Sequence, residues 1–440
     1  MQSRRKFLTN ASAVSAGFLG LSRLCAAPAA AVADPFGPLL EDPKKILNLP
    51  KGFTYKVLSK LGDPMTDGYK TPGKPDGMAA FEGPDGEVIL IRNHELSLSM
   101  ADHGPFEDNS SLPQGFKRPN CYDSGGPGEA PMVGGTTTMV FDEEAGELVS
   151  DSISLLGTDR NCAGGITPWG TWITCEEPEQ KAMTTPRGQK HGYCFEVTPS
   201  TEIDFQRPKP LTALGRYRHE AVAVDPETSI VYLTEDLADG LLYRFVPSEP
   251  GNLAAGKLQA LGIRDQPEAV TAIDFPIGKP TDVDWIDLED VNSPNNDLRL
   301  HGRLKGAAVF ARAEGMWWGH DAVYFVCTSG GKIGKGQIWR YLPKTDQIEL
   351  YLEPNDTDLL ENGDNITIAP FGDLFICEDA KKEVNMIRGV TKKGEFYTLA
   401  ANALNNSEFA GACFSPSGKT MFVNIQNPGL TLAITGPWEG

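Results

Sequence analysis

The sequence has little histidine, six residues in 440, and it carries no serine-centred or histidine-rich hydrolase motif. It therefore shows no signature of a side-chain nucleophile. Basic residues are also few. The sequence has 40 lysines and arginines against 59 aspartates and glutamates, which gives a formal net charge of −19. A nucleic-acid surface needs a basic stripe, so we expect no nucleic acid as a regulatory partner. The acidic excess indicates either solubility alone or carboxylates gathered for cations.

Long apolar runs are absent after residue 33, so we expect no transmembrane segment in the mature chain, because a spanning helix needs about 20 apolar residues. Residues 1–33 combine a basic start, a short apolar stretch at 11–21 and the small residues Ala31-Val32-Ala33 as a cleavage site. The start, residues 3–8 with their two arginines, fits a twin-arginine signal. We predict a twin-arginine signal peptide over 1–33 and a mature chain, 34–440, exported already folded to the periplasm or beyond.

Paired cysteine motifs are also missing. Seven cysteines follow the predicted signal, an odd number, and no CxxC occurs among them. Cys175, Cys327, Cys377 and Cys413 stand inside apolar runs, which predicts buried small hydrophobes. Cys162 differs because it lies between Asn161 and a glycine-rich turn.

Helical periodicity is scarce, and short β-rich runs alternate with glycine and proline turns, a pattern typical of all-β proteins. One unit recurs: polar residues, an apolar strand, a tight turn, a second apolar strand and polar residues again. Its six copies span residues 76–95, 161–177, 218–236, 312–329, 364–379 and 409–427. Repetition of this kind predicts a single six-bladed β-propeller over 34–440.

The polar residues of each copy should converge on one mouth of the central channel. The first strand of a blade lines the channel and the second runs antiparallel, so the start of one meets the end of the other. Collected there are Glu95, Cys162, Glu176, Glu177, Glu220, Glu235, Asp236, Glu314, Asp364, Asn365, Glu378 and Asp379. So many carboxylates cannot stay ionised and unpaired in a partly enclosed site.

Metal ions are the expected partners, because Arg218 and Arg312, the arginines noted at the repeat starts, cannot neutralise the whole set. Oxygen ligands suit calcium and ferric iron, and the thiol of Cys162 favours a transition metal at its corner. His94 and His219 each precede an acidic residue, and they either bind a metal or orient that residue.

At these residues the sequence resembles the PhoX family of bacterial secreted alkaline phosphatases. The segments that carry the resemblance are 93–95, 161–171, 174–177, 219–220, 312–315, 364–367, 377–379, 409–411 and 422–429. The resemblance implies a twin-arginine signal, a six-bladed propeller, and a cluster of two ferric ions with two or three calcium ions.

Residue roles follow from the same resemblance. Cys162 and Glu220 resemble iron ligands, with Glu314 close to the iron–calcium core. Glu95 belongs to the expected metal set, and the residues that resemble calcium or bridging ligands are Glu176, Glu177, Asn365 and Glu378. Arg218 and Arg312 resemble the substrate-binding arginines, which would clamp phosphate oxygens.

The leading hypothesis is a secreted, metal-dependent alkaline phosphatase that hydrolyses small phosphomonoesters and uses the twin-arginine export machinery. One alternative is a calcium-dependent propeller hydrolase of the lactonase or phosphotriesterase type, which needs neither Cys162 nor the arginines. Another is a non-catalytic propeller stabilised by metal.

Overall fold

The computed structural model describes residues 29–32, 34–126, 128–179, 189–203 and 205–438. The predicted signal peptide, apart from residues 29–32, lies outside this part of the chain. None of the helices in the described ranges is long and apolar enough to cross a membrane.

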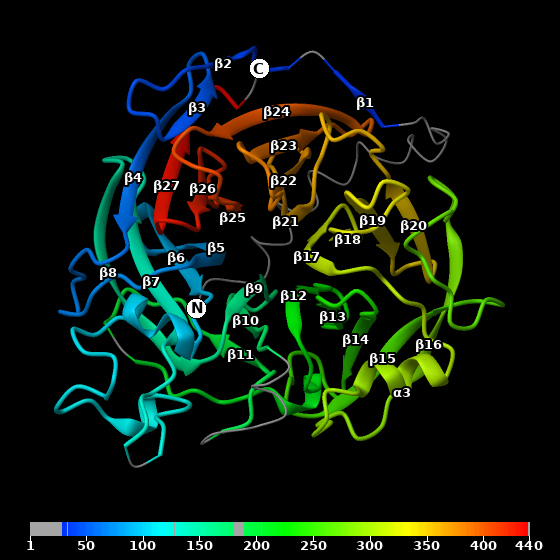
Figure 1. Ribbon diagram of the computed structural model, residues 1–440, viewed down its shortest axis with the longest axis horizontal. Helices are drawn as coiled ribbons and strands as arrows, with labels where there is room; N and C mark the ends of the chain where they lie inside the picture. The colour runs from blue at the N-terminus through cyan, green and yellow to red at the C-terminus, as the bar shows by residue number, and fades with distance from the viewer. Residues whose placement is uncertain (1–28, 33, 127, 180–188, 204, 439–440) are drawn as a thin grey trace.

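Antiparallel strands are arranged around a central axis (Figure 1). Within the described residues they form five sheets, and the nine-stranded sheet contains two four-stranded units, so that six units can be distinguished. The first two units are β5 (Pro75–Glu82), β6 (Glu87–His94), β7 (Gly134–Asp142) and β8 (Glu147–Thr158), then β9 (Asn161–Ile166), β10 (Trp172–Glu176) and β11 (Cys194–Val197). The third and fourth are β12 (His219–Val224), β13 (Val231–Glu235), β14 (Leu242–Pro247) and β15 (Gly256–Ile263), then β17 (Ala313–Gly319), β18 (Ala322–Cys327), β19 (Gln337–Leu342) and β20 (Gln347–Leu352). The last two are β21 (Gly363–Ile368), β22 (Leu374–Glu378), β23 (Met386–Val390) and β24 (Glu395–Asn402), then β25 (Phe409–Phe414), β26 (Thr420–Ile425), β27 (Leu430–Thr435) and β4 (Thr54–Lys60).

The remaining elements lie outside the six units. They are β1 (Ala30–Ala31), β2 (Leu39–Leu40), β3 (Leu47–Pro50), β16 (Thr281–Asp287), the helix α3 (Leu298–Leu304) and short 3-10 turns at Pro84–Gly86, Leu98–His103, Arg118–Asn120 and Thr212–Leu214. Strand β16 bridges β15 and β20, which joins the third and fourth units into one sheet.

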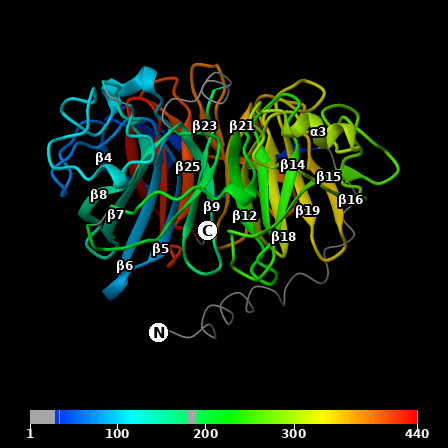
Figure 2. The same cartoon turned by 90° about the horizontal axis from the view of Figure 1, so that it is seen from below.

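The first strands of the units surround the axis. β5, β9, β12, β17, β21 and β25 each contact the next, and β25 contacts β5 again. Seen from the side, β9, β12, β21 and β25 lie in the middle of the molecule, with β8 and β16 at its two flanks (Figure 2). The prediction of an all-β propeller is confirmed.

The ring closes through its two ends. β4, from the N-terminal part of the described chain, pairs antiparallel with β27, so that Thr54 faces Thr435. Between the units, apolar side chains form continuous cores, and the four cysteines predicted as small hydrophobes are at most 1% exposed. Their burial confirms that prediction, since a thiol within an apolar strand packs as a hydrophobic group.

Every first strand carries the same irregularity near its start, where two of its residues face one residue of the second strand. These two-residue bulges are Asp76–Gly77, Cys162–Ala163, Glu220–Ala221, Glu314–Gly315, Asp364–Asn365 and Gly411–Ala412. A bulge redirects side chains relative to the pleat of the strand. The same local feature therefore presents a polar residue to the axis in five of the six units.

The channel is nearly closed beneath these bulges. The first strands approach so closely that a Cβ on Gly77 would lie 2.6 Å from the Ala163 Cα, and one on Gly315 would lie 2.5 Å from the Asp364 carbonyl oxygen. Below them remains a cavity of about 20 Å³ among Met78, Met316 and their neighbours, room for about one water molecule. The polar bulge residues lie near the starts of the first strands, and those starts together define one mouth of the central channel.

Candidate metal centre

Two groups of potential metal ligands lie at that mouth. The cysteine group consists of Glu95, Cys162 and Glu177, and the glutamate group consists of Glu220, Glu314 and Asp364. Within each group, one ligand atom per residue lies within 4.8 Å of the others, and all six residues are buried. The bulges of four units and the ends of two second strands bring them together.

Glu220 carries the strongest indication of an ion. Its side chain has no exposed surface, and neither carboxylate oxygen has a hydrogen-bond partner among the residues that the structure describes. Burial, followed by the charges of Glu177 and Asp364, raises the pKa of the Glu220 carboxyl well above its usual range. A buried carboxylate without donors is costly, and a bound cation removes that cost. The residues present thus fit a metal site.

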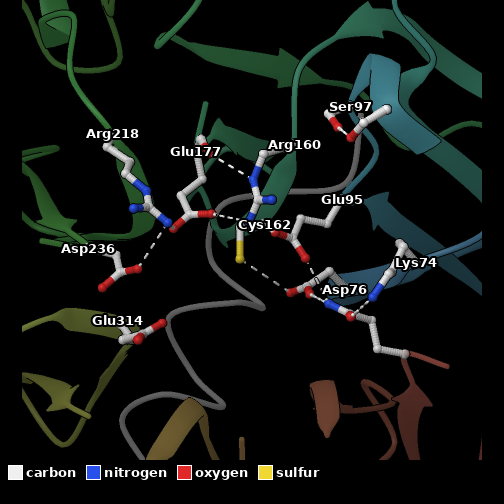
Figure 3. Close-up of polar contacts among 12 residues, drawn as sticks. Lys74, Asp76, Glu95, Ser97, Arg160, Cys162, Glu177, Arg218, Asp236 and Glu314 are labelled. Atoms are coloured by element: carbon white, nitrogen blue, oxygen red, sulfur yellow. Dashed lines mark hydrogen bonds and ion pairs between the residues drawn. The ribbon is translucent and has the colours of Figure 1, made fainter. Parts of the chain in front are cut away.

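Cys162 lies among carboxylates. Its thiol is 3.8 Å from Asp76 Oδ1 (Figure 3), and burial, then the charges of Asp76 and Glu220, raise the pKa of the Cys162 thiol well above its usual range. Asp76 is a residue that the predicted metal set omits, although it opens the first repeat copy. A metal ion at this corner would favour the thiolate that these carboxylates oppose.

Asp76 is tied to the cysteine group by one amide. Gln426 Nε2 donates to Asp76 Oδ2 at 2.9 Å and to Glu95 Oε2 at 2.8 Å. Gln426 stands at the end of β26, where the sequence shows no carboxylate. The amide thus holds two acids side by side.

Three arginines, Arg160, Arg218 and Arg312, pair with acids at the mouth, and Figure 3 shows the first two. Arg160 pairs with Glu95 and donates to Glu177 Oε2 at 3.0 Å. Arg218 pairs with Glu177 and lies 3.4 Å from Asp236 Oδ2. The sequence prediction of arginines at the mouth included Arg218 but missed Arg160. Arg160 stands two residues before Cys162, just as Arg218 stands two residues before Glu220, and this shared spacing could have identified it.

Arg312 completes the series. Its Nε donates to Asp236 Oδ1 at 2.7 Å, and its Nη2 lies 2.6 Å from Glu314 Oε1. Asp236 therefore lies between Arg218 and Arg312, and the structure brings both predicted substrate-binding arginines to the predicted mouth.

The acidic pairs at the second-strand ends divide into two kinds. In Glu176-Glu177 the first residue turns into its own blade, where Glu176 Oε1 accepts from the Asp159 N–H (2.9 Å) and contacts His191 Nδ1 (2.7 Å). Its Oε2 accepts from the N–H groups of Gly192 (2.7 Å) and Tyr193 (3.1 Å). The structure does not bring Glu176 into either group, because successive side chains of a strand point to opposite sides.

Glu378 repeats this arrangement. It accepts from the Met386 N–H at 2.9 Å and Arg388 Nε at 3.0 Å, and Lys382 Nζ lies 2.7 Å away. Glu235 does so in the third unit, accepting from the Tyr243 hydroxyl at 2.7 Å. These three glutamates occupy donor sets supplied by their own blades.

Asn365 and Asp364 share the fifth bulge. Asn365 donates to Asp364 Oδ1 at 3.0 Å and accepts from the Gly411 N–H. Burial, then the charge of Asp379, raises the pKa of Asp364 to about 7. Asn365 thus lies beside the glutamate group, where its amide orients a member of that group.

The two histidines next to predicted ligands are turned away from them. His94 contacts the Gly73 carbonyl oxygen (2.8 Å) and Thr137 Oγ1 (2.9 Å). His219 contacts Cys194 Sγ (3.3 Å) and the Gly215 carbonyl oxygen (3.2 Å), and burial lowers the pKa of His219 to about 4. Both imidazoles use their nitrogens inside the blades.

A groove of about 1220 Å³ opens beside the cysteine group. Lys74, Gln426, Glu408 and Asp379 line it, together with residues 402–407. Because Gln426 also contacts Asp76 and Glu95, the groove borders the candidate metal centre.

The sequence matches the profile of the family described as alkaline phosphatase PhoX over residues 34–154 and 147–429. Among solved structures, it is similar to PhoX of Pseudomonas fluorescens in complex with vanadate, a transition state analogue. That similarity has 18% identity and a TM-score of 0.67, covering 93% of this chain and 98% of that one.

Weaker similarity extends to other proteins. A gluconolactonase from Xanthomonas campestris has 8% identity and a TM-score of 0.43, covering 91% of this chain and 98% of that one. A putative 6-phosphogluconolactonase from Bacteroides uniformis has 11% identity and a TM-score of 0.39, with 86% and 90% covered. No curated protein matches the sequence significantly.

Proposed function

We propose, on the premise that this chain belongs to the PhoX family of alkaline phosphatases, that its metal centre hydrolyses phosphomonoesters. The chain is a metal-dependent phosphatase by that membership. The finer assignments, namely the ester class, the ions and the residue roles, are our proposal. Glu220, a buried carboxylate with two unpartnered oxygens, is the observation that carries it.

The ligand sets suit two kinds of ion. We assign iron to the site of Cys162, because a thiolate prefers a transition metal, and calcium to the sites of oxygen ligands. Glu220, in the neighbouring group, is assigned to iron by the family resemblance. The proposed ligands are Cys162, Glu95, Glu177, Glu220, Glu314 and Asn365, to which the geometry adds Asp76 and Asp364. Two ferric ions with two or three calcium ions is the composition that the family resemblance implies.

Glu176 and Glu378 remain predicted ligands that no observation supports directly. Their hydrogen bonds to backbone N–H groups and to neighbouring cations favour a structural role instead.

The chain's own residues would bind and orient the phosphoryl group. When bound, the ions supply positive charge against the phosphoryl oxygens and activate the attacking water. Arg218 and Arg312, both held by Asp236, present guanidinium groups at the rim of the mouth. On substrate binding, each guanidinium would replace some of its hydrogen bonds to carboxylates by hydrogen bonds to phosphoryl oxygens. Two phosphoryl oxygens can accept from one guanidinium in a bidentate arrangement. The closed channel beneath the bulges limits entry of substrate to one side.

Metal analysis of the purified protein, beside a phosphatase assay with and without chelator, tests the proposal. We expect stoichiometric iron and calcium, hydrolysis of p-nitrophenyl phosphate, and loss of both metals and activity with chelator. Cys162→Ala should lose iron and most activity. Near-full activity with retained metal in that variant would instead fit a calcium-only hydrolase, and metal without any hydrolysis would fit a non-catalytic propeller.

Export by the twin-arginine pathway is part of the same proposal, based on the sequence at residues 3–8. Replacing Arg4 and Arg5 together by lysine should leave the protein in the cytoplasm of the producing bacterium. Unchanged export of that variant would contradict this pathway.

A further inference from the structure

Lys74 occupies, in the first unit, the position that Arg160 and Arg312 occupy in the second and fourth. Each of the three residues stands two positions before a bulge, and each has a left-handed backbone, with φ values of 49°, 52° and 50°. Their carbonyl oxygens accept equivalent bonds, from the N–H groups of Glu95 (2.8 Å), Glu177 (2.9 Å) and Thr328 (2.9 Å) respectively. The equivalence is therefore one of backbone geometry as well as of sequence interval.

Arg218 stands at the same interval before Glu220, so the first four units each place a cation at the rim. The fifth unit has Asn362 there, with φ 49° and a carbonyl oxygen that accepts from the Asp379 N–H at 2.9 Å. The rim is thus cationic on one side of the mouth and uncharged at the fifth unit.

Lys74 differs from the three arginines in its partners. Each arginine is paired with carboxylates of the site, whereas the Lys74 ammonium donates to an amide oxygen, Gln426 Oε1, at 2.8 Å (Figure 3). In the described part of the chain, no carboxylate forms an ion pair with it. An ammonium group has three donors, so Lys74 keeps donors and charge available for an anion.

The groove supplies the access that such a role needs. Lys74 and Gln426 both line the groove, and Gln426 links Lys74 to Asp76 and Glu95. An anion entering from the groove would meet the ammonium group immediately before it reaches the metal centre.

We infer that Lys74 is a further substrate-binding residue, the fourth cation of the rim, and that it binds an oxygen of the phosphoryl group where the groove meets the metal centre. This rests on the proposed function. The alcohol part of the ester then lies in the groove, which is far larger than a phosphate and is lined by Asn405, Asn406 and Asn427. These amides suit a polar, hydrogen-bonding leaving group.

Lys74→Gln, Lys74→Arg and Lys381→Ala, compared in the metal-loaded protein, test the inference. Lys381 lines the same groove but is exposed, which makes it the matched control. We expect Lys74→Gln to raise KM for p-nitrophenyl phosphate and the dissociation constant for inorganic phosphate about tenfold. Its kcat should stay within about threefold and its metal content should be unchanged. Lys74→Arg should recover most of the affinity, and Lys381→Ala should bind inorganic phosphate as tightly as the unsubstituted protein does.

Two outcomes would overturn the inference while the proposed function stands. In one, phosphate affinity in Lys74→Gln equals that of the Lys381→Ala control. In the other, Lys74→Gln loses metal, which would show that Lys74 only positions Gln426. If the unsubstituted protein hydrolyses no phosphoester, the proposed function fails, and direct binding of inorganic phosphate, measured by calorimetry, still decides the role of Lys74.

Discussion

Glu176 and Glu220 are both carboxylates without exposed surface, and their surroundings are opposite. Glu176 accepts hydrogen bonds from three backbone N–H groups and contacts His191, all within its own blade. Within the described part of the chain, Glu220 has a hydrogen-bond partner for neither oxygen. A buried carboxylate with a full set of donors stabilises the fold without an ion, whereas one without donors needs a cation. Burial alone therefore does not separate a structural acid from a functional one; the donors around it do.

The same contrast recurs along the ring. At the second-strand ends, Glu176, Glu235 and Glu378 face their blades, and Glu177 and Asp236 face the arginines of the mouth. Two neighbouring acids thus separate into a structural position and a functional position, because a strand alternates its sides. Each of the following variants tests that division.

Glu220→Gln should have the largest effect. The amide keeps the size of the side chain but removes the charge that a cation needs, so bound metal should be lost and kcat/KM should fall about a thousandfold, about 4 kcal/mol. Metal analysis and steady-state kinetics measure both. In chelator, its melting temperature should lie within a few degrees of that of the unsubstituted protein, because burial raises the pKa of the Glu220 carboxyl and so favours its uncharged form. Full metal content with normal kinetics would end the assignment of Glu220 as a ligand.

Glu176→Gln should act on stability instead. An amide cannot replace all the contacts of Glu176, and His191 would lose its main counter-charge. Against the lowering effect of burial, the charge of Glu176 and the hydrogen bond to Asp123 raise the pKa of His191 to about 10. Breaking a buried pair of this kind costs about 3 kcal/mol of unfolding free energy, which urea unfolding measures.

The turnover of the folded fraction of Glu176→Gln should stay within about twofold of normal, with full metal content. Unchanged stability combined with lost metal would show that Glu176 is a ligand after all.

Asp364→Asn should change the pH dependence of the metal-free protein. Burial, followed by the charge of Asp379, raises the pKa of Asp364 from 3.8 to about 7. Between these values the folded state binds the proton and the unfolded state has released it, so stability falls as pH rises. Since neighbouring acids share the protons, we expect Asp364→Asn to remove about 2 kcal/mol of that decline.

Melting temperatures from pH 4 to pH 8 in chelator measure this difference. Added metal should flatten the decline in the unsubstituted protein, because a cation favours the ionised carboxylates. A decline of equal slope in both proteins would contradict the role of Asp364.

Glu235→Gln should have the smallest effect. Burial, opposed by the Tyr243 hydrogen bond, raises the pKa of Glu235 to about 7, and Oε1 has no partner. The group is therefore about half protonated at neutral pH, and a neutral amide should cost less than about 1 kcal/mol, with unchanged kinetics. If Glu235→Gln lost as much unfolding free energy as Glu176→Gln, the number of hydrogen-bond donors around each glutamate would not explain the difference in their contributions to stability.

Much of this architecture was readable from the sequence. The copy at 76–95 corresponds to β5 and β6, and the copy at 161–177 to β9 and β10, because alternation and turn residues act over a few positions. The closure of β4 on β27 was not predicted, since it joins segments nearly a chain length apart. Arg160 and Lys74 were missed although their interval before Cys162 and Asp76 repeats that of Arg218 before Glu220.

The sequence by itself determined that acids recur at one or both ends of most strand pairs, because the repeat carries them and the blade gathers those ends at one mouth. Only the tertiary structure decided which acids form the candidate metal centre. Gly192 and Tyr193 supply donors to Glu176, and no comparable segment of the described chain reaches Glu220. The free energy of a buried charge depends on the groups that the whole fold places around it, and those groups are distant in sequence from the charge.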